Sequence, residues 1–284
     1  MGIDIDVAKF LLSGRERGVN YKKSLTLGSQ QLRFFNYDYT NLAGIFNLKN
    51  FTDVKTSRDF FQFLGAEEIS AMDFSDYEGA SILHDLNQPV GDELTEKFTF
   101  VLDGGTMEHV FNFPTALANA MQMVETGGHL AVITGGNNFL GHGFYQFSPE
   151  LFYRALSAEN GFQVKRMIAA EVGGNWYEVA DPQTVKSRVE LINDKPVYLM
   201  VLAQKQASKP LFTTAPQQSD YVEMWQGDAE NQTGETAPSK LKSILKKNEF
   251  VREKLINIKQ KQFEQNVKKE RSFANSRAFK LVDK

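Results

Sequence analysis

Cysteine is absent from the 284 residues of this chain, and its absence excludes several kinds of chemistry. Without a thiol the protein forms no disulfide, has no cysteine nucleophile and binds neither zinc nor an iron–sulfur cluster through thiolates. Long apolar runs are also missing, since none approaches the roughly 18 residues that suggest a membrane span. The first residues have no basic stretch ahead of their short apolar part, as a signal peptide would. We therefore expect a cytoplasmic protein without a membrane span.

A strong excess of either charge is missing as well. Lysine and arginine total 32 and acidic residues 35, which gives a net charge of -3. This balance provides no general attraction to nucleic acid or to an anionic membrane, so no nucleic-acid partner is expected. Hydrophobic residues make up 42% and charged residues 24%, which is ordinary for a globular protein with one large domain and an appendage, or with two modest domains.

Helical and strand-like segments alternate from residue 1 to about residue 205. This order predicts an α/β domain in which helices cover both faces of a parallel sheet. Two later strand candidates, residues 162–172 and 196–204, are joined by a polar loop without a crossover helix, so they should pair antiparallel. The expected helices cover residues 5–12, 56–64, 114–124 and 148–158, and the expected earlier strands cover residues 24–27, 69–72, 80–83, 98–102 and 129–134.

The composition changes after this domain. Glutamine, threonine, serine, proline and glycine are frequent in residues 207–238, which predicts a linker or a surface wrap. Residues 239–269 are rich in lysine and place apolar residues at helical spacing. Because glutamates are interleaved with the lysines, this helix should pack on the core or pair with a second copy to form a homo-oligomer. The predicted organisation is a domain over 1–205, a linker over 206–238 and a helical extension over 239–284.

The most informative stretch is FTFVLDGGTMEHVFN, residues 98–112. Its near-continuous apolar run is typical of a parallel strand covered on both faces, and Asp103 stands where that strand leaves the sheet. Open α/β sheets bind ligands at this edge. Glycine permits close approach of the backbone to a ligand, while Glu108 and His109 add an acceptor and a group that titrates near neutral pH. The alternative is an ordinary connection between a strand and a helix.

Comparable positions follow the other strands, since Gly28, Asp73 and Asp85 come after the first, second and third strand in that order. Because these residues follow the strands in this order, the chain resembles a class I S-adenosylmethionine-dependent methyltransferase over roughly residues 20–205. The resemblance implies a Rossmann-like, mostly parallel sheet of seven strands with a terminal antiparallel hairpin. It also implies that S-adenosyl-L-methionine binds along the carboxyl ends of the first four strands.

The resemblance further implies roles for single residues. It aligns TLGSQ, residues 26–30, with the first cofactor motif, where one glycine replaces the usual glycine-rich loop. Asp73 would accept hydrogen bonds from the ribose hydroxyls, and Asp85 would contact the adenine amine. The long gap before Asp73 indicates an inserted segment near residues 37–49. The cofactor-binding residues implied in this way are Gly28, Ser29, Gln30, Asp73, Phe74, Asp85, Leu86, Asp103 and Gly104.

Residues 137–152, NNFLGHGFYQFSPELF, resemble the loop after the fifth strand in methyltransferases of sugar and cell-surface glycan pathways. This resemblance implies O-methylation of a sugar or of a glycan-linked small molecule. Methyl transfer requires that two reactants be positioned and that a hydroxyl lose its proton, for which histidine is a natural base. The candidate catalytic bases are His109 and His142, and the residues expected to contact the acceptor are Glu108, His109, His142 and Tyr145.

Several alternatives stay open at this point. Each of the two histidines could be a structural group at a loop corner, and the acids after the second and third strands could cap local turns. Asp103, Glu108, His109 and His142 could together bind a metal, but they form no tight ligand-spacing motif, so we expect no metal. A catalytically degenerate methyltransferase-fold binding or scaffold protein would fit the thin first motif. A nicotinamide-dependent oxidoreductase would need the G-x-G-x-x-G motif, which does not follow the first strand.

Overall fold

One sheet of nine strands organises the part of the chain that the structure describes. The structure is a computed structural model, and it describes residues 2–222, 264–265 and 267–282. The order of the strands across the sheet is β3-β2-β1-β4-β5-β8-β6-β7-β9. Their bounds are β1 (Lys23–Leu27), β2 (Glu68–Asp73), β3 (Ile82–Leu83), β4 (Phe98–Gly104), β5 (Val124–Asn137), β6 (Phe162–Glu171), β7 (Trp176–Val179), β8 (Val197–Lys205) and β9 (Phe279–Leu281).

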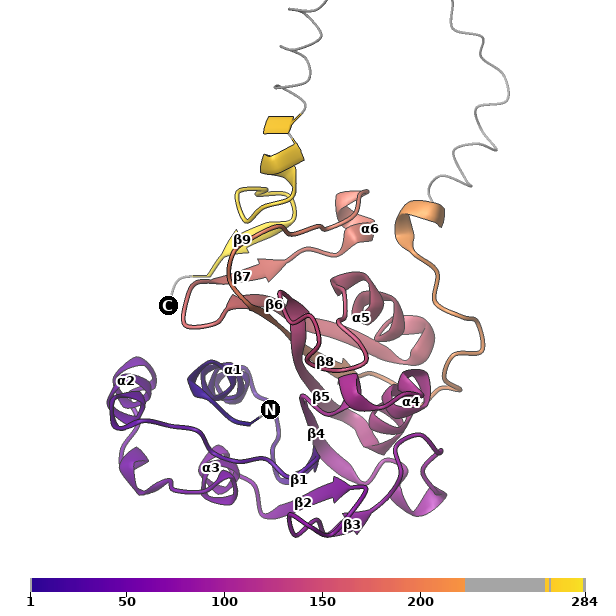
Figure 1. Cartoon of the computed structure of the whole chain (residues 1–284). Helices are drawn as coiled ribbons and strands as arrows, with labels where there is room; N and C mark the ends of the chain where they lie inside the picture. Colours follow the sequence, from indigo (N-terminus) through magenta and orange to yellow (C-terminus); the bar gives the residue numbers. More distant parts are fainter. Residues whose placement is uncertain (1, 223–263, 266, 283–284) are drawn as a thin grey trace, which may run out of the picture.

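Helices cover both faces of this sheet. Helices α1, α2 and α3 lie on one face, and α4 and α5 lie on the other (Figure 1). In the described residues none of the helices is long and apolar enough to cross a membrane. The bounds are α1 (Ile5–Glu16), α2 (Asn36–Phe46), α3 (Ser57–Leu64), α4 (Phe113–Met123), α5 (Pro149–Ala155) and α6 (Pro182–Val185), with short 3-10 helices η1 (Phe51–Asp53), η2 (Asp92–Leu94), η3 (Met107–His109) and η4 (Ala158–Asn160).

The alternating side chains of β4 explain why the core has two layers. Every residue of β4 is buried. Val101 belongs to the apolar cluster on the side of α4 and α5, whereas its neighbours Phe100 and Leu102 belong to the cluster on the side of α1 and α3. Because successive side chains of a strand point to opposite faces, a strand covered on both sides must be apolar at nearly every position. This is the pattern from which the strand was predicted.

Local signals set the ends of the helices. Thr56 precedes α3, and its side chain accepts a hydrogen bond from the backbone of Asp59, while the Asp59 side chain accepts one from the backbone of Thr56. This reciprocal capping box satisfies backbone donors that a helix start leaves free. Gly65 ends the helix with φ of +108°, in the left-handed region that glycine adopts without steric cost.

The four helices predicted within residues 1–205 and the seven predicted strands are confirmed, and so is the antiparallel pairing of the last two predicted strands, because β6 pairs with β8. Two predictions about the sheet were wrong. The described sheet has nine strands, not seven, since β7 and β9 were missed. It is mixed instead of mostly parallel, because the four pairs from β3 to β5 are parallel and the four from β5 to β9 are antiparallel. Strand β7 lies in the segment predicted as a polar loop, and β7 and β9 are strands through their pairing with β6 and with each other.

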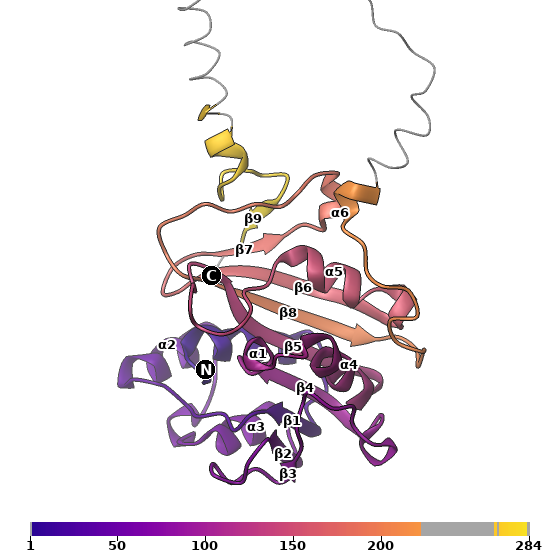
Figure 2. The same ribbon diagram turned by 45° about the vertical axis from the view of Figure 1, so that its right-hand side comes forward.

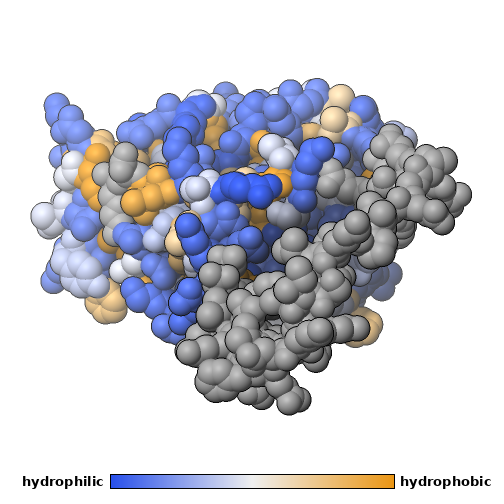
Figure 3. Space-filling view, turned by 90° about the horizontal axis from the view of Figure 1, so that it is seen from above, coloured by the Kyte–Doolittle hydropathy of each residue, from blue (hydrophilic) through white to orange (hydrophobic). Residues whose placement is uncertain are grey.

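The last described residues return to the sheet. Strand β9 pairs antiparallel with β7, as Figure 2 shows from a second side, and the ring of Phe273 stacks on Tyr177 with centroids 3.9 Å apart. The surface at this end of the molecule is largely hydrophilic, with hydrophobic residues in smaller groups (Figure 3). Almost all of the predicted helix over 239–269 lies outside the described residues, so the helical extension and its pairing stay predictions.

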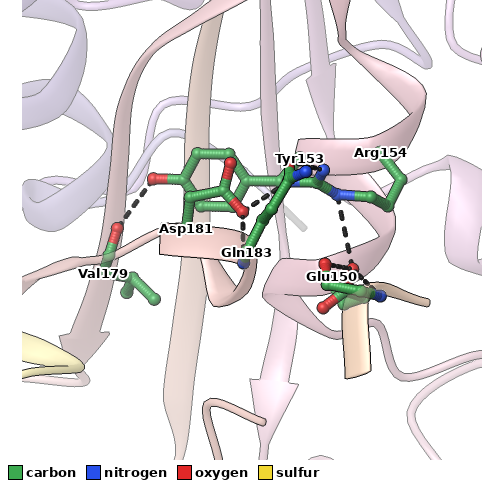
Figure 4. A network of polar contacts seen from close by, with 7 residues as sticks. Glu150, Tyr153, Arg154, Val179, Asp181 and Gln183 are labelled. Atoms are coloured by element: carbon green, nitrogen blue, oxygen red, sulfur yellow. Dashed lines mark hydrogen bonds and ion pairs between the residues drawn. The ribbon is translucent and has the colours of Figure 1, made fainter. Parts of the chain in front are cut away.

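A polar network ties α5 to the segment that follows β7 (Figure 4). The guanidinium of Arg154 pairs with the carboxylate of Asp181, donates a hydrogen bond of 2.6 Å to Gln183 Oε1, and lies 3.3 Å from Glu150 Oε1. Tyr153 donates a hydrogen bond of 2.7 Å to the carbonyl of the last residue of β7. Because these groups are mostly shielded from water, their contacts should contribute more than exposed surface pairs do.

We expect Arg154→Ala to lower the free energy of unfolding by about 1–3 kcal/mol, because it removes a charge-assisted fork and leaves two carboxylates without their shared partner. Arg154→Lys keeps the charge but not the planar fork, so it should lose an intermediate amount. Urea unfolding of the three proteins followed by circular dichroism measures these differences. Equal stability of wild type and Arg154→Ala would show that the network contributes nothing to folding.

Candidate active site

The order in which successive strands are added to the sheet reverses between β1 and β4, which pair in parallel. From β1 the order runs through β2 to β3 on one side, and from β4 it runs through β5 on the other. The connections after β1 and β4 lead to helices on opposite faces of the sheet, α2 and α3 on one and α4 on the other (Figure 1). Open α/β sheets bind ligands in a crevice at the carboxyl ends of such a pair of strands. Two groups of polar side chains lie in these loops, one around Gly28 and one around Glu108.

The first group surrounds a cavity of about 230 Å³. Its lining includes Gly28, Ser29, Gln30 and Asp73, four of the residues predicted to bind the cofactor. The structure adds further polar lining residues that the sequence analysis did not identify. In the sequence, the only feature that points to these residues is their position in loops after predicted strands, and many other polar residues have such a position. These additional residues are Gln31, Arg33, Glu78 and Thr106.

Only glycine fits at position 28. Its φ is +71°, and a β-carbon added there would lie 2.7 Å from Thr106 Oγ1. The Gly28 N–H donates a hydrogen bond of 2.7 Å to the carbonyl of Met72 in β2. The Thr106 hydroxyl in turn donates to the carbonyl of Leu27 at 2.8 Å. The single glycine of the first motif therefore allows the loop after β1 to pass close to the loop after β4.

Gln30 reaches across the same crevice. Its Nε2 donates to the Leu27 carbonyl at 3.2 Å, and a β-carbon on Gly104 would lie 2.5 Å from its Oε1. Among the described residues this Oε1 has no hydrogen-bond partner although it is buried. Since buried acceptors are nearly always paired, Gln30 Oε1 is suited to a donor on a ligand in the cavity.

The other implied cofactor residues lie outside the lining of this cavity. Asp85 Oδ1 accepts hydrogen bonds of 2.9 and 2.8 Å from the backbone and side-chain nitrogens of Asn87, which is the local turn considered as its alternative role. These bonds lower the pKa of Asp85. Leu86 is buried in the core, and the Phe74 side chain is 76% exposed. The structure therefore groups Asp73 with Gly28, but not Asp85 with either.

Asp103 is fully buried at the end of β4 and shapes the turn that follows. Its Oδ1 accepts hydrogen bonds from the backbone N–H groups of Thr106 at 2.9 Å and Met107 at 3.1 Å. Its Oδ2 has no partner among the described residues. Burial, together with the nearby negative charge of Glu108, raises the pKa of Asp103 to about 8.

The second polar group is centred on Glu108 in η3. The side chain is 1% exposed, and neither carboxylate oxygen has a hydrogen-bond partner within the described part of the chain. His142 Nε2 lies 3.7 Å from Glu108 Oε1, an ion-pair distance that is too long for a hydrogen bond. The Glu108 carbonyl accepts hydrogen bonds from Phe144 N at 2.8 Å and Tyr145 N at 3.2 Å. These two bonds hold the loop after β5 against η3.

The four residues predicted to contact the acceptor therefore converge. The rings of His109 and His142 have centroids 5.2 Å apart, and one ligand atom each from Glu108, His109 and His142 lie within 4.8 Å of one another. Tyr145 donates a hydrogen bond of 2.7 Å from its hydroxyl to the Phe111 carbonyl. The sequence analysis did not identify the aromatic neighbours Phe111 and Phe144, whose side chains are 74% and 69% exposed.

The raised pKa of Asp103 predicts a pH-dependent stability. Because the pKa in the folded state, about 8, is above the value of about 4 for a free aspartate, stability is full below pH 4 and is lost as the pH rises to about 8. The slope should approach about 1.4 kcal/mol per pH unit. Asp103→Asn keeps the Oδ1 acceptor and should flatten this slope. Denaturant unfolding between pH 4 and pH 8 with EDTA present tests this, and identical slopes would contradict it.

No model of a known protein family matches the chain, and no curated protein matches it by sequence. Similar solved structures include the branched-chain polyamine synthase of Thermus thermophilus, at 12% identity and a TM-score of 0.39, over 75% of this chain and 59% of that chain. Geranyl diphosphate methyltransferase in complex with SAM has 11% identity and a TM-score of 0.40, over 71% and 85% of the two chains. The 1,6-didemethyltoxoflavin-N1-methyltransferase of Burkholderia thailandensis, with bound S-adenosylhomocysteine, has 14% identity and a TM-score of 0.39, over 72% and 78%. At these identities and TM-scores the likeness identifies neither the activity nor the substrate of this chain.

Proposed function

We propose that the chain is an S-adenosylmethionine-dependent methyltransferase. The observation that carries the proposal is the pair of polar groups along one crevice, because the cavity at Gly28 and the cluster at Glu108 lie on the loops after β1 and β4. A two-substrate enzyme needs such adjacent sites, one for the methyl donor and one for the acceptor. The ordered positions after the strands, through which the sequence resembles class I methyltransferases, support the same assignment.

The residues around the cavity fit the chemical groups of the donor. S-adenosylmethionine carries a ribose diol, an ammonium, a carboxylate and a methylated sulfonium. The Asp73 carboxylate would accept hydrogen bonds from the diol, the Arg33 guanidinium would pair with the carboxylate, and the buried Gln30 Oε1 would accept from the ammonium. When bound, the donor supplies the methyl group for an in-line displacement by the acceptor.

The residues of the second group would position the acceptor and take its proton. A methylated hydroxyl loses a proton as the new bond to carbon forms, and His109 or His142 would accept it. The exposed rings of Phe111 and Phe144, each two residues after one of these histidines, have centroids 6.0 Å apart and form an apolar surface. Exposed apolar surface next to polar groups is typical of a ligand site. We propose a hydroxyl of a sugar or of a glycan-linked small molecule as the acceptor.

One observation favours a different function. The side chains of Thr106 and Gln30 occupy the space over Gly28 and Gly104, so they narrow the crevice where a glycine-rich loop would leave it open. A chain that had lost the cofactor would tolerate such narrowing and could serve as a binding or scaffold protein. A nicotinamide-dependent oxidoreductase has less support, since one glycine cannot form the turn that seats a pyrophosphate.

Calorimetric titration separates these three functions. We expect S-adenosylmethionine and S-adenosylhomocysteine to bind and NAD to give no heat. Asp73→Ala should weaken binding of both sulfur ligands by roughly tenfold or more, because it removes a charged acceptor. The control is Asp76→Ala, which removes a neighbouring acid that does not line the cavity. Absence of heat with both sulfur ligands would end the methyltransferase proposal.

Turnover tests the second group of residues. With a panel of free and nucleotide-linked sugars as acceptors, formation of S-adenosylhomocysteine should fall by about a hundredfold or more in a variant that lacks the base. We expect this loss in His109→Ala or His142→Ala, with unchanged affinity for the donor. His84→Ala is the control, because His84 lies at the end of β3 and contacts the Gln88 carbonyl. Wild-type turnover in both active-site variants would exclude the two histidines as bases.

A further inference from the structure

The Glu108 carboxylate is buried without a partner that balances its charge. Both of its oxygens are inaccessible to water and lack hydrogen bonds, and no lysine or arginine among the described residues pairs with it. Burial of an ionised carboxylate without such partners is strongly unfavourable. The nearest group that can carry positive charge is His142, with Nε2 at 3.7 Å from Oε1. The carboxylate therefore has an imidazole nitrogen near it, but at a distance too long for a hydrogen bond.

We propose that Glu108, His109 and His142 bind one divalent transition-metal cation of the zinc class. One ligand atom from each lies within 4.8 Å of the others. A metal with bonds of about 2.0–2.2 Å holds its ligands roughly 3–4 Å apart, so the Glu108–His142 separation is already in this range. The cation would neutralise the buried carboxylate and accept both imidazoles.

The fold holds these ligands from two sides of the crevice. Glu108 and His109 are neighbours in η3, and His142 lies in the loop after β5, which is fixed to η3 by the two hydrogen bonds to the Glu108 carbonyl. Gly143 makes this approach possible, because a β-carbon there would lie 2.7 Å from the same carbonyl oxygen. The start of this loop is also held, since the Phe139 N–H donates a hydrogen bond of 2.9 Å to Gln146 Oε1. The ligands are thus positioned by backbone contacts independent of any metal.

The ligand types select the class of cation. Two imidazoles and one carboxylate suit zinc, manganese, iron or cobalt, whereas magnesium and calcium prefer oxygen ligands throughout. Three protein ligands leave at least one coordination position open. A cation at this place would lower the pKa of an acceptor hydroxyl, and the two histidines would then act as ligands and not as bases. This catalytic role rests on the proposed methyltransferase function, but the binding of the metal does not.

Titration of the EDTA-treated full chain with zinc chloride tests the site without any turnover assay. We expect one equivalent to bind, and cobalt chloride to give a visible absorption band that zinc removes. Glu108→Gln, His109→Ala and His142→Ala should each weaken zinc binding by at least about tenfold. Magnesium chloride should not compete. The matched control is His84→Ala, which removes a histidine away from the cluster and should leave affinity unchanged.

Two results would overturn the proposal. One is the absence of saturable zinc binding by the wild type, and the other is wild-type affinity in both Glu108→Gln and His142→Ala. Because Glu108 is buried, circular dichroism must show that its variant is folded; His142 is on an exposed loop and provides a second variant that does not alter the core. Calorimetry with S-adenosylmethionine on the metal-free protein tests the methyltransferase proposal separately, so failure of one leaves the other standing.

Discussion

The close contact between the loops after β1 and β4 is the constraint on which the site depends. The carbonyl of Leu27, the last residue of β1, accepts hydrogen bonds from the Thr106 hydroxyl and the Gln30 amide. The bond from Thr106 joins the two loops, and it requires them to approach more closely than a side chain at position 28 would allow. The crevice at the reversal of the sheet is therefore bounded by side chains from both loops, and Asp73 of the neighbouring strand completes one end of it.

Two buried acids, Asp103 and Glu108, place negative charge at the other end of the crevice. One carboxylate oxygen of Asp103 accepts hydrogen bonds from two backbone N–H groups, which fixes the turn after β4. Neither carboxylate oxygen of Glu108 has a hydrogen bond within the described residues. Their mutual repulsion in a water-poor environment is relieved by a proton on one acid or by a cation on the other. Protonation of Asp103 and binding of a metal by Glu108 would each reduce this negative charge, and neither prevents the other. This charge explains why two imidazoles are gathered beside Glu108.

Prediction from the sequence succeeded where apolar residues form a run or a regular pattern and failed where strand pairing is decided at long range. The run at Phe98 to Leu102 identified β4 because both of its faces are buried. In contrast, β9 has a single buried residue, Phe279, and becomes a strand only through its pairing with β7 about a hundred residues earlier. For Asp85 the local alternative is the one that the structure contains, because its carboxylate caps a turn at Asn87, two residues further along the chain.

The sequence by itself determined seven of the strands and the helices α1, α3, α4 and α5, and that an acid or a glycine follows each of the first four strands. These properties are local, since periodicity, capping residues and glycine act within a few residues. Only the tertiary structure decided which of the polar residues meet. Thr106 and Arg33 line the cavity, and His142 faces Glu108, because loops from different strands converge at one edge of the sheet. Such convergence depends on the order of the strands and on close packing, which no spacing along the chain encodes.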